Sequence, residues 1–87
     1  MPKIFFHINA ILVLMNNLRD KKVLEQFGVK LKELRLKKGL TLEQLAFEAD
    51  IELSQVHRVE KGKINPTLTT LDALAKGLGL SLSELLA

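Results

Sequence analysis

Residues 41–60 read TLEQLAFEADIELSQVHRVE and hold two short helical patterns separated by a turn. Two helices that meet at a tight turn need a small residue where their axes cross, and Ala46 supplies it. The turn needs a residue that tolerates a positive φ, and aspartate, here Asp50, is one of the few types besides glycine that does. Val56 and Val59 anchor the second helix. This spacing predicts a helix-turn-helix, whose second helix is a rod that fits the major groove of DNA.

The segments on either side of this unit are also expected to be helical. Apolar residues at intervals of three and four predict a first helix over about residues 23–38, and a third helix covers roughly 53–61. Each of these two helices is followed by a glycine, which commonly ends a helix. Between them, Thr41 and Gln44 have the spacing of a capping box, which starts the second helix.

Two further helices are expected after residue 65. The segment Asn65-Pro66-Thr67 breaks the chain and starts a fourth helix, and Ser81 with Glu84 forms a second capping box that starts a short fifth one. With short loops and no repeat, residues 22–87 are predicted to form one all-α domain, a compact bundle of five helices. The fourth helix is expected to turn its apolar side chains inward, at Leu68, Leu71, Leu74, Ala75 and Leu78.

Residues 1–21 differ in composition from the rest and are interpreted as a separate apolar extension. The even positions from 4 to 14 are all apolar, while the polar His7 and Asn9 fall on odd positions, which favours a β-strand. The helical domain offers no strand to pair with. Three interpretations therefore stay open: an arm that pairs with another subunit, a floppy or helical extension, and translation that begins at Met15.

The composition excludes several classes of protein. The chain has no cysteine and only two histidines, His7 and His57, so we expect no metal site and no cofactor. It has no serine–histidine–acid arrangement and no glycine-rich phosphate loop, which predicts that it is not an enzyme. The longest apolar run, residues 4–15, is shorter than the roughly 20 residues that span a bilayer. We expect a cytoplasmic protein that does not enter a membrane.

Several blocks of sequence together resemble the Cro/cI-like, or XRE, family of bacterial and phage helix-turn-helix regulators. The resemblance covers about residues 27–86 and implies a λ-repressor-like bundle, a function as sequence-specific transcriptional regulator, and double-stranded DNA as partner. The matching blocks stand in the family's order and are LKELR at 31–35, GLTLEQLA at 39–46, VEKG at 59–62, NP at 65–66 and LDALA at 71–75.

The resemblance also implies which residues read DNA bases. In the family, the start and the exposed face of the third helix contact base edges, which here correspond to Leu53, Ser54, Gln55 and Arg58. The guanidinium of Arg58 suits guanine O6 and N7, and the amide of Gln55 suits adenine or a phosphate. Each of these residues has the alternative of being an ordinary solvated side chain.

A second set of residues is expected to contact the DNA backbone. Lys61, Lys63 and Asn65 match family positions that grip phosphates, and such contacts set register without reading sequence. Thr41, at a helix N-terminus, and the outward-facing His57 are further candidates for phosphate contacts. The alternative for the lysines is ordinary solvation.

The resemblance further implies an ion pair, and the sequence departs from the family pattern at two positions. The family pairs an arginine of the first helix with a glutamate at the end of the third, and Arg35 and Glu60 match these positions. Their implied role is to orient the recognition helix. Leu42 stands where the family commonly has a glutamine that contacts phosphate, and Glu52 is a poor cap for the third helix.

The formal charge of +3 is unevenly distributed. Residues 28–40 carry a net +4 and residues 41–60 a net −4, with Arg58 as the sole cation of the second segment. We therefore expect weak non-specific binding to DNA. The acidic unit leaves open a second interpretation, in which the same fold docks another protein. An antitoxin or a restriction-modification controller are narrower possibilities within the DNA-binding class.

A homodimer is expected, because family members of this size usually bind DNA as two-fold dimers. The terminal helix is more apolar than so short a helix needs for itself, at Leu82, Leu85 and Leu86. The apolar extension is a further surface through which two copies could associate.

Overall fold

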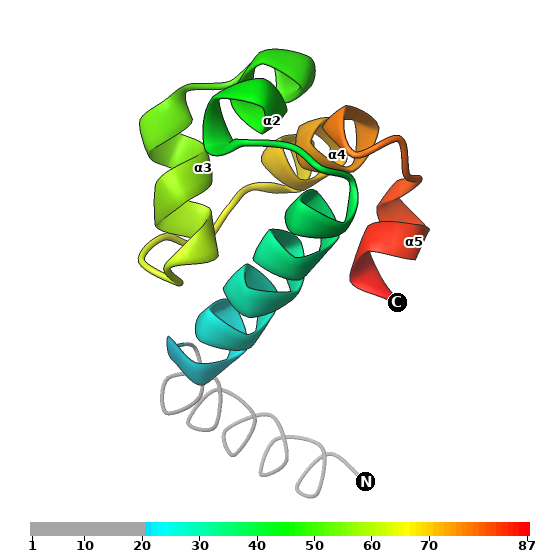
Figure 1. Ribbon diagram of the computed structural model, residues 1–87. Helices are drawn as coiled ribbons and strands as arrows, with labels where there is room; N and C mark the ends of the chain where they lie inside the picture. Colours follow the sequence, from blue (N-terminus) through cyan, green and yellow to red (C-terminus); the bar gives the residue numbers. More distant parts are fainter. Residues whose placement is uncertain (1–20) are drawn as a thin grey trace, which may run out of the picture.

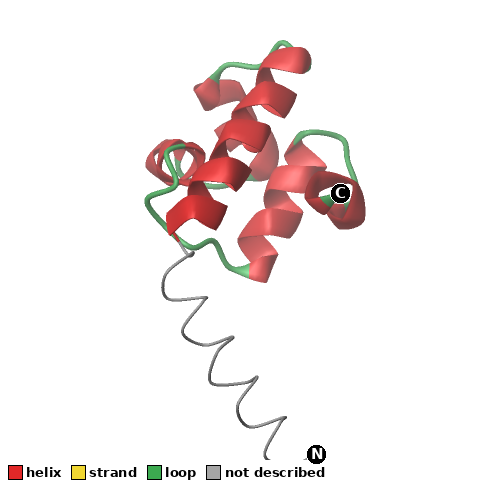
Figure 2. Ribbon diagram, turned by 90° about the horizontal axis from the view of Figure 1, so that it is seen from below, coloured by secondary structure: helices red, strands yellow, loops and turns green. Residues whose placement is uncertain are grey.

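The structure, a computed structural model, describes residues 21–87, and the regular structure in this part of the chain is all helical (Figure 1, Figure 2). The predicted all-α bundle of five helices is therefore confirmed for the described residues. The predicted apolar extension covers residues 1–21, and residues 1–20 of it, with the stretch that favours a β-strand, lie outside the described residues. Lys21, the last residue of the predicted extension, is helical. The helices are a first helix over 21–37, α2 (Leu42–Ala49), α3 (Leu53–Glu60), α4 (Leu68–Gly77) and α5 (Leu82–Leu86).

The helices pack around α2 and α4. Helix α2 packs against both α3 and α4, and α4 packs against α5. The first helix runs between α3 on one side and α5 on the other (Figure 1). Its Gly28 meets the backbone at the end of α3, and its Lys30 donates a hydrogen bond to the main chain at Ala87. The first helix thus supports the end of α3, the predicted recognition helix.

One apolar core receives side chains from all five helices. Ala46, Val56 and Val59 lie in it, as the helix-turn-helix spacing predicted. Because α2 and α3 both bury one face in this core, the angle between them is fixed by packing as well as by the turn. The buried members are Leu31, Leu45, Ala46, Ala49, Val56, Val59, Leu74, Ala75, Leu78 and Leu85.

The turn between α2 and α3 has the predicted geometry. Asp50 lies in the left-handed region with φ 56 and ψ 46, which confirms its predicted role. The N–H groups of Asp50 and Ile51 reach back to the carbonyls of Phe47 and Ala46, at 3.2 and 3.1 Å. Within residues 21–87, Asp50 is the one residue other than glycine with a positive φ.

The helix starts also follow the sequence. Thr41 with Gln44, and Ser81 with Glu84, form the two predicted capping boxes. Helix α3 begins after Glu52, whose side chain makes no capping hydrogen bond, as expected from its type. The start of α3 therefore has no side-chain cap, and the first buried residue of this helix is Val56.

Two expectations about apolar side chains are corrected. Leu68 was expected to face inward but is 66% exposed, because it is the first residue of α4, whereas the buried residues of that helix, Leu74 and Ala75, lie in its second half. Leu85 was expected at a surface between subunits but is fully buried in the core of this chain. Among the three leucines of α5, Leu82 is half-buried and Leu86 is 51% exposed, so only these two retain surface for a partner.

Candidate nucleic-acid interface

Helix α3 has one face in the core and one face in solvent. Val56, Val59 and Glu60 are buried. Within residues 21–87, no side-chain hydrogen bond or ion pair engages Arg58 or Ser54, so both polar groups are available to a ligand. The exposed face carries Leu53, Ser54, His57 and Arg58, which include three of the four predicted base contacts.

Gln55, the fourth predicted base contact, is placed differently from the other three. Its side chain is half-buried, and its Nε2 donates a hydrogen bond to Oγ1 of Thr70 in the first turn of α4, at 3.3 Å. Thr70 was not identified from the sequence. The only signal is that Thr67 and Thr70 have the spacing of a helix cap, which says nothing of α3.

Arg35 of the first helix and Glu60 at the end of α3 lie together as a buried ion pair. Nε of Arg35 is 2.7 Å from Oε2 of Glu60, and Nη2 is 3.1 Å from Oε1, which makes the contact bidentate. Nη1 donates a third hydrogen bond to the carbonyl of Leu40 at 2.8 Å. The two charged side chains are only 8% and 4% exposed.

This pair anchors the C-terminal end of α3 electrostatically. The hydrogen bond with Glu60 raises the pKa of Arg35 above its ordinary value, although burial of the guanidinium acts in the opposite direction. Arg35 therefore stays charged throughout the physiological pH range. Because each side chain satisfies the other's charge, loss of either one would leave a buried charge without its partner.

The backbones of the first helix and the end of α3 also approach closely, a feature not identified from the sequence. Gly28 is buried, and a Cβ there would lie 2.3 Å from the carbonyl oxygen of Glu60 and 2.7 Å from that of Val59. A Cβ on Gly62, which has φ +68, would lie 2.8 Å from Cα of Glu25. A lone glycine inside a helical pattern is the sequence signal for such packing.

The predicted contacts to the DNA backbone all lie on the surface. Thr41 already uses two groups in its capping box: Oγ1 accepts the N–H of Gln44 at 3.1 Å, and its own N–H donates to Oε1 of Gln44 at 2.8 Å. The Thr41 hydroxyl hydrogen and the first amides of α2 are left for an anion. The exposed residues of this set are Thr41, His57, Lys61, Lys63 and Asn65.

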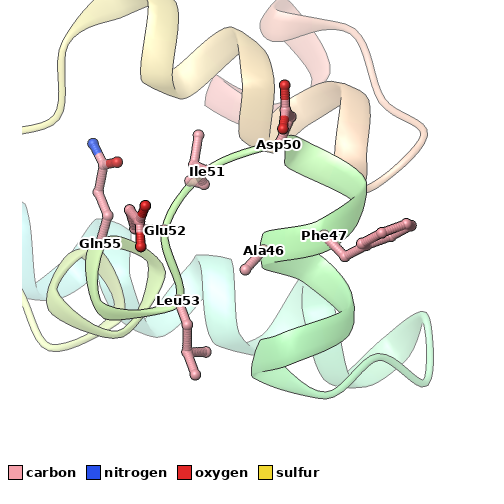
Figure 3. Close-up of a pocket in the computed structure, with 7 residues that line it drawn as sticks. All are labelled: Ala46, Phe47, Asp50, Ile51, Glu52, Leu53 and Gln55. Atoms are coloured by element: carbon pink, nitrogen blue, oxygen red, sulfur yellow. The ribbon is translucent and has the colours of Figure 1, made fainter.

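A groove of about 680 Å³ opens between the end of α2 and the start of α3 (Figure 3). Phe47, which is 83% exposed, points away from α3, while Leu53 and Gln55 extend from opposite sides of the start of α3. Two carboxylates, of Asp50 and Glu52, belong to the lining. A phosphate in this groove would meet negative charge, so the groove itself is not an anion site. The lining consists of Ala46, Phe47, Asp50, Ile51, Glu52, Leu53 and Gln55.

The exposed charges of residues 28–40 and of residues 41–60 remain opposite in sign in the folded chain. Arg35 and Glu60 neutralise one another in their buried pair, which takes one charge from each segment. What is left on the surface of residues 41–60 is Arg58 with four carboxylates, those of Glu43, Glu48, Asp50 and Glu52. Positive charge comes instead from the first helix and from the lysines after α3.

Residues 21–87 contain neither a candidate membrane span nor a candidate metal site. In this part of the chain, no helix has the length and apolar character needed to cross a bilayer. No group of three histidine, aspartate or glutamate side chains there is arranged to hold a metal ion.

Comparison with known proteins links this geometry to a family. Residues 31–85 match the model of the helix-turn-helix family HTH_3. The control protein C.MunI of Mycoplasma sp is 41% identical over 61 residues, which are 69% of this chain and 82% of that protein. The HTH-type transcriptional regulator DdrOP3 of Deinococcus deserti is 39% identical over 57 residues, which are 66% of this chain but only 44% of the longer protein.

Solved structures show the same likeness. The restriction-modification controller protein C.AhdI from Aeromonas hydrophila superposes with a TM-score of 0.71 at 41% identity. The match covers 74% of this chain and 97% of C.AhdI, so nearly the whole of that protein is represented here.

Proposed function

Because the chain belongs to the helix-turn-helix family HTH_3, whose named relatives are transcriptional regulators and control proteins, we propose that it regulates transcription by placing α3 in the major groove of specific DNA. The exposed face of α3 is the observation that carries this proposal. Arg58 and Ser54 are free on that face, while the opposite face is held by the core and the end of the helix by Arg35. A rigid helix with free polar groups on one side suits base recognition.

Each base contact has a proposed chemistry. Arg58 donates to O6 and N7 of a guanine, a bidentate contact worth about 1–3 kcal/mol of discrimination. Ser54 bonds to either purine or pyrimidine edges, and Leu53, at 40% exposure, meets a thymine methyl group. Gln55 reads adenine with the part of its amide that Thr70 leaves free.

The backbone contacts are proposed for Lys61, Lys63 and Asn65 after α3, with Thr41 at the start of α2 and His57 beside them. These contacts set the register of α3 but carry no sequence information. Because the four exposed carboxylates of residues 41–60 oppose the approach of phosphate, non-specific affinity should be low. The affinity for the target site should then depend more on the base contacts than on the phosphate contacts.

The proposal is tested by fluorescence anisotropy with a labelled duplex from upstream of the protein's own gene. Unlabelled random duplex serves as competitor, and titrations at two salt concentrations separate phosphate contacts from base contacts. Arg58→Ala should weaken specific binding by about 1–3 kcal/mol. Lys76→Ala is the matched control, because it also removes one exposed positive charge, here from the last turn of α4, and should bind as the wild type does.

Absence of binding at low salt would contradict the proposal. It would favour the alternative that the same fold docks another protein, for which the acidic groove and the exposed Phe47 are the supporting observations. A pull-down with the intact chain would then identify that partner.

A homodimer is part of the proposal. Two copies related by a two-fold axis would place their α3 helices in half-sites about 34 Å apart. Leu86 is 51% exposed and Leu82 half-buried at the end of the chain, which leaves an apolar surface for a second copy. Leu86→Glu should reduce the mass measured by light scattering to that of a monomer. Leu68→Glu, which charges an exposed leucine on α4 instead, is the control and should remain dimeric.

The narrower role of restriction-modification controller is supported by the share of each control protein that the chain matches, as well as by identity. The chain covers 82% of C.MunI and 97% of C.AhdI, whereas it covers under half of DdrOP3. We therefore propose that its operator lies beside genes for a restriction enzyme and a methyltransferase. If the protein binds its own upstream region but neither gene is adjacent in the genome, the proposed function as a transcriptional regulator stands and the role as restriction-modification controller is refuted.

A further inference from the structure

The first turn of α4 carries a network of hydroxyl groups that reaches the recognition helix. Thr67, the N-cap, accepts the N–H of Thr70 at 3.2 Å, and its hydroxyl donates to Oγ1 of Thr70 at 3.0 Å. Thr69 lies 3.0 Å from the same Thr67 hydroxyl. Oγ1 of Thr70 also accepts Nε2 of Gln55 from α3. One oxygen therefore receives a donor from its own helix and a donor from the recognition helix.

This arrangement restricts Gln55 before any DNA is bound. A free glutamine side chain has many rotamers, and freezing them on binding lowers affinity. Oγ1 of Thr70, itself held by the Thr67 cap, holds the amide nitrogen of Gln55 at 3.3 Å. Among the residues described, Ser54 and Arg58 have no comparable partner, so Gln55 is the one base-reading candidate of α3 that is held in advance.

The bond also determines what Gln55 presents. A glutamine amide has two N–H donors and one carbonyl acceptor. With one N–H on Thr70, the carbonyl oxygen and the second N–H are left. An acceptor beside a donor is the pattern that complements N6 and N7 of adenine in the major groove.

We propose that Thr70, although it does not touch DNA itself, is a positioning residue that orients Gln55 to select an A·T base pair within the target site. This inference rests on the proposed function, because it requires α3 to lie in the major groove. It assigns a role in specificity to α4, a helix outside the helix-turn-helix.

The test compares three variants of the full chain. Thr70→Val keeps the shape and the capped backbone N–H but removes the oxygen that holds Gln55. Thr70→Ser retains that oxygen. Thr69→Val, the matched control, removes a hydroxyl one residue away that bonds to Thr67 but not to Gln55. Thermal unfolding of all three shows whether each is folded.

The probe is a duplex selected by the wild-type chain from a randomised library, together with single base-pair substitutions at every position. The wild type should prefer A·T at one position of each half-site, and Gln55→Ala should lose this preference. Thr70→Val should reduce it about three- to tenfold. Thr70→Ser and Thr69→Val should retain it. A merely structural defect would weaken binding to all of the duplexes alike and would not single out one base pair.

Several results would overturn the inference. Thr70→Val could keep every base preference of the wild type, or Thr70→Ser could lose the preference as Thr70→Val does. If Thr70→Val proves unstable, the NMR resonances of the Gln55 side-chain amide are compared in the wild type and in Thr70→Ser. Signals typical of a freely rotating side chain in both proteins would also refute the inference. A wild-type chain that selects no sequence removes the proposed function itself, whereas a selective wild type with an unaltered Thr70→Val removes only the role of Thr70.

Discussion

Replacement of Gly28 by alanine should destabilise the protein, although alanine is the better helix former. In an unconstrained helix interior, Gly→Ala stabilises by about 1 kcal/mol. Here the new Cβ would lie 2.3 Å from the carbonyl oxygen of Glu60, and the contact must open by about 0.7 Å to reach even 3.0 Å. The obstructing atoms belong to the backbone, so no side-chain rotation relieves the clash.

The expected magnitude follows from these two opposing effects. Overpacking a tight contact costs about 1–3 kcal/mol, and the value here should be near the upper end because Arg35 holds Glu60 in place. After subtraction of the gain in helix propensity, we expect a net loss of about 2 kcal/mol. For a domain of this size, that corresponds to a decrease in Tm of about 10 °C.

Urea denaturation followed by far-UV circular dichroism measures the difference directly. The midpoint should fall while the slope stays constant, because the surface exposed on unfolding does not change. Gln26→Ala is the control, since Gln26 is exposed on the same helix and its substitution should be nearly neutral. A Gly28→Ala protein as stable as the wild type, or more stable, would refute the close approach of the two backbones.

Three further predictions concern the ends of the helices. Glu60→Leu leaves the Arg35 guanidinium buried without its counter-charge and should lower the free energy of unfolding by about 3 kcal/mol. If the loss in the double variant Arg35→Leu, Glu60→Leu equals the sum of the losses in the two single leucine variants, the pairing is contradicted. Asp50→Ala should be less stable than Asp50→Gly by about 1 kcal/mol in urea denaturation, because a Cβ makes the left-handed backbone conformation unfavourable and glycine has none. Equal midpoints would argue against strain at this position. Hydrogen bonds from Ser81 lower the pKa of Glu84 below its ordinary value of 4.5, so its contribution to stability is complete above that pH and is lost as the pH falls through the lowered pKa. Glu84→Gln should flatten this acid dependence in thermal unfolding, and an unaltered profile would exclude Glu84 as its source.

The sequence was most informative where structure depends on neighbours along the chain. Thr41 and Gln44, three residues apart, predicted a capping box that the structure contains. The positive φ of Asp50 could be predicted because few residue types tolerate it and the turn requires one. The apolar pattern of α3 likewise predicted that Val56 and Val59 would be buried.

What the sequence could not supply depends on contacts between distant segments. The hydrogen bond from Gln55 to Thr70 joins two helices, and neither residue type indicates the other. The contact of Gly28 with Glu60 depends on how the first helix crosses α3. Leu85 and Leu86 have the same side chain, and only the rotation of α5 on the bundle makes one buried and the other exposed.

The two faces of α3 differ in how much a substitution on them would disturb the fold. Leu53, Ser54 and Arg58 contribute little to the core, so a mutation at any of them alters the exposed surface at little expense to folding. Gly28 and Glu60 cannot be replaced as easily, since they hold the C-terminal end of α3 against the first helix. A scaffold divided in this way can acquire a new target sequence through single substitutions, while the angle at which the helix is presented is inherited unchanged.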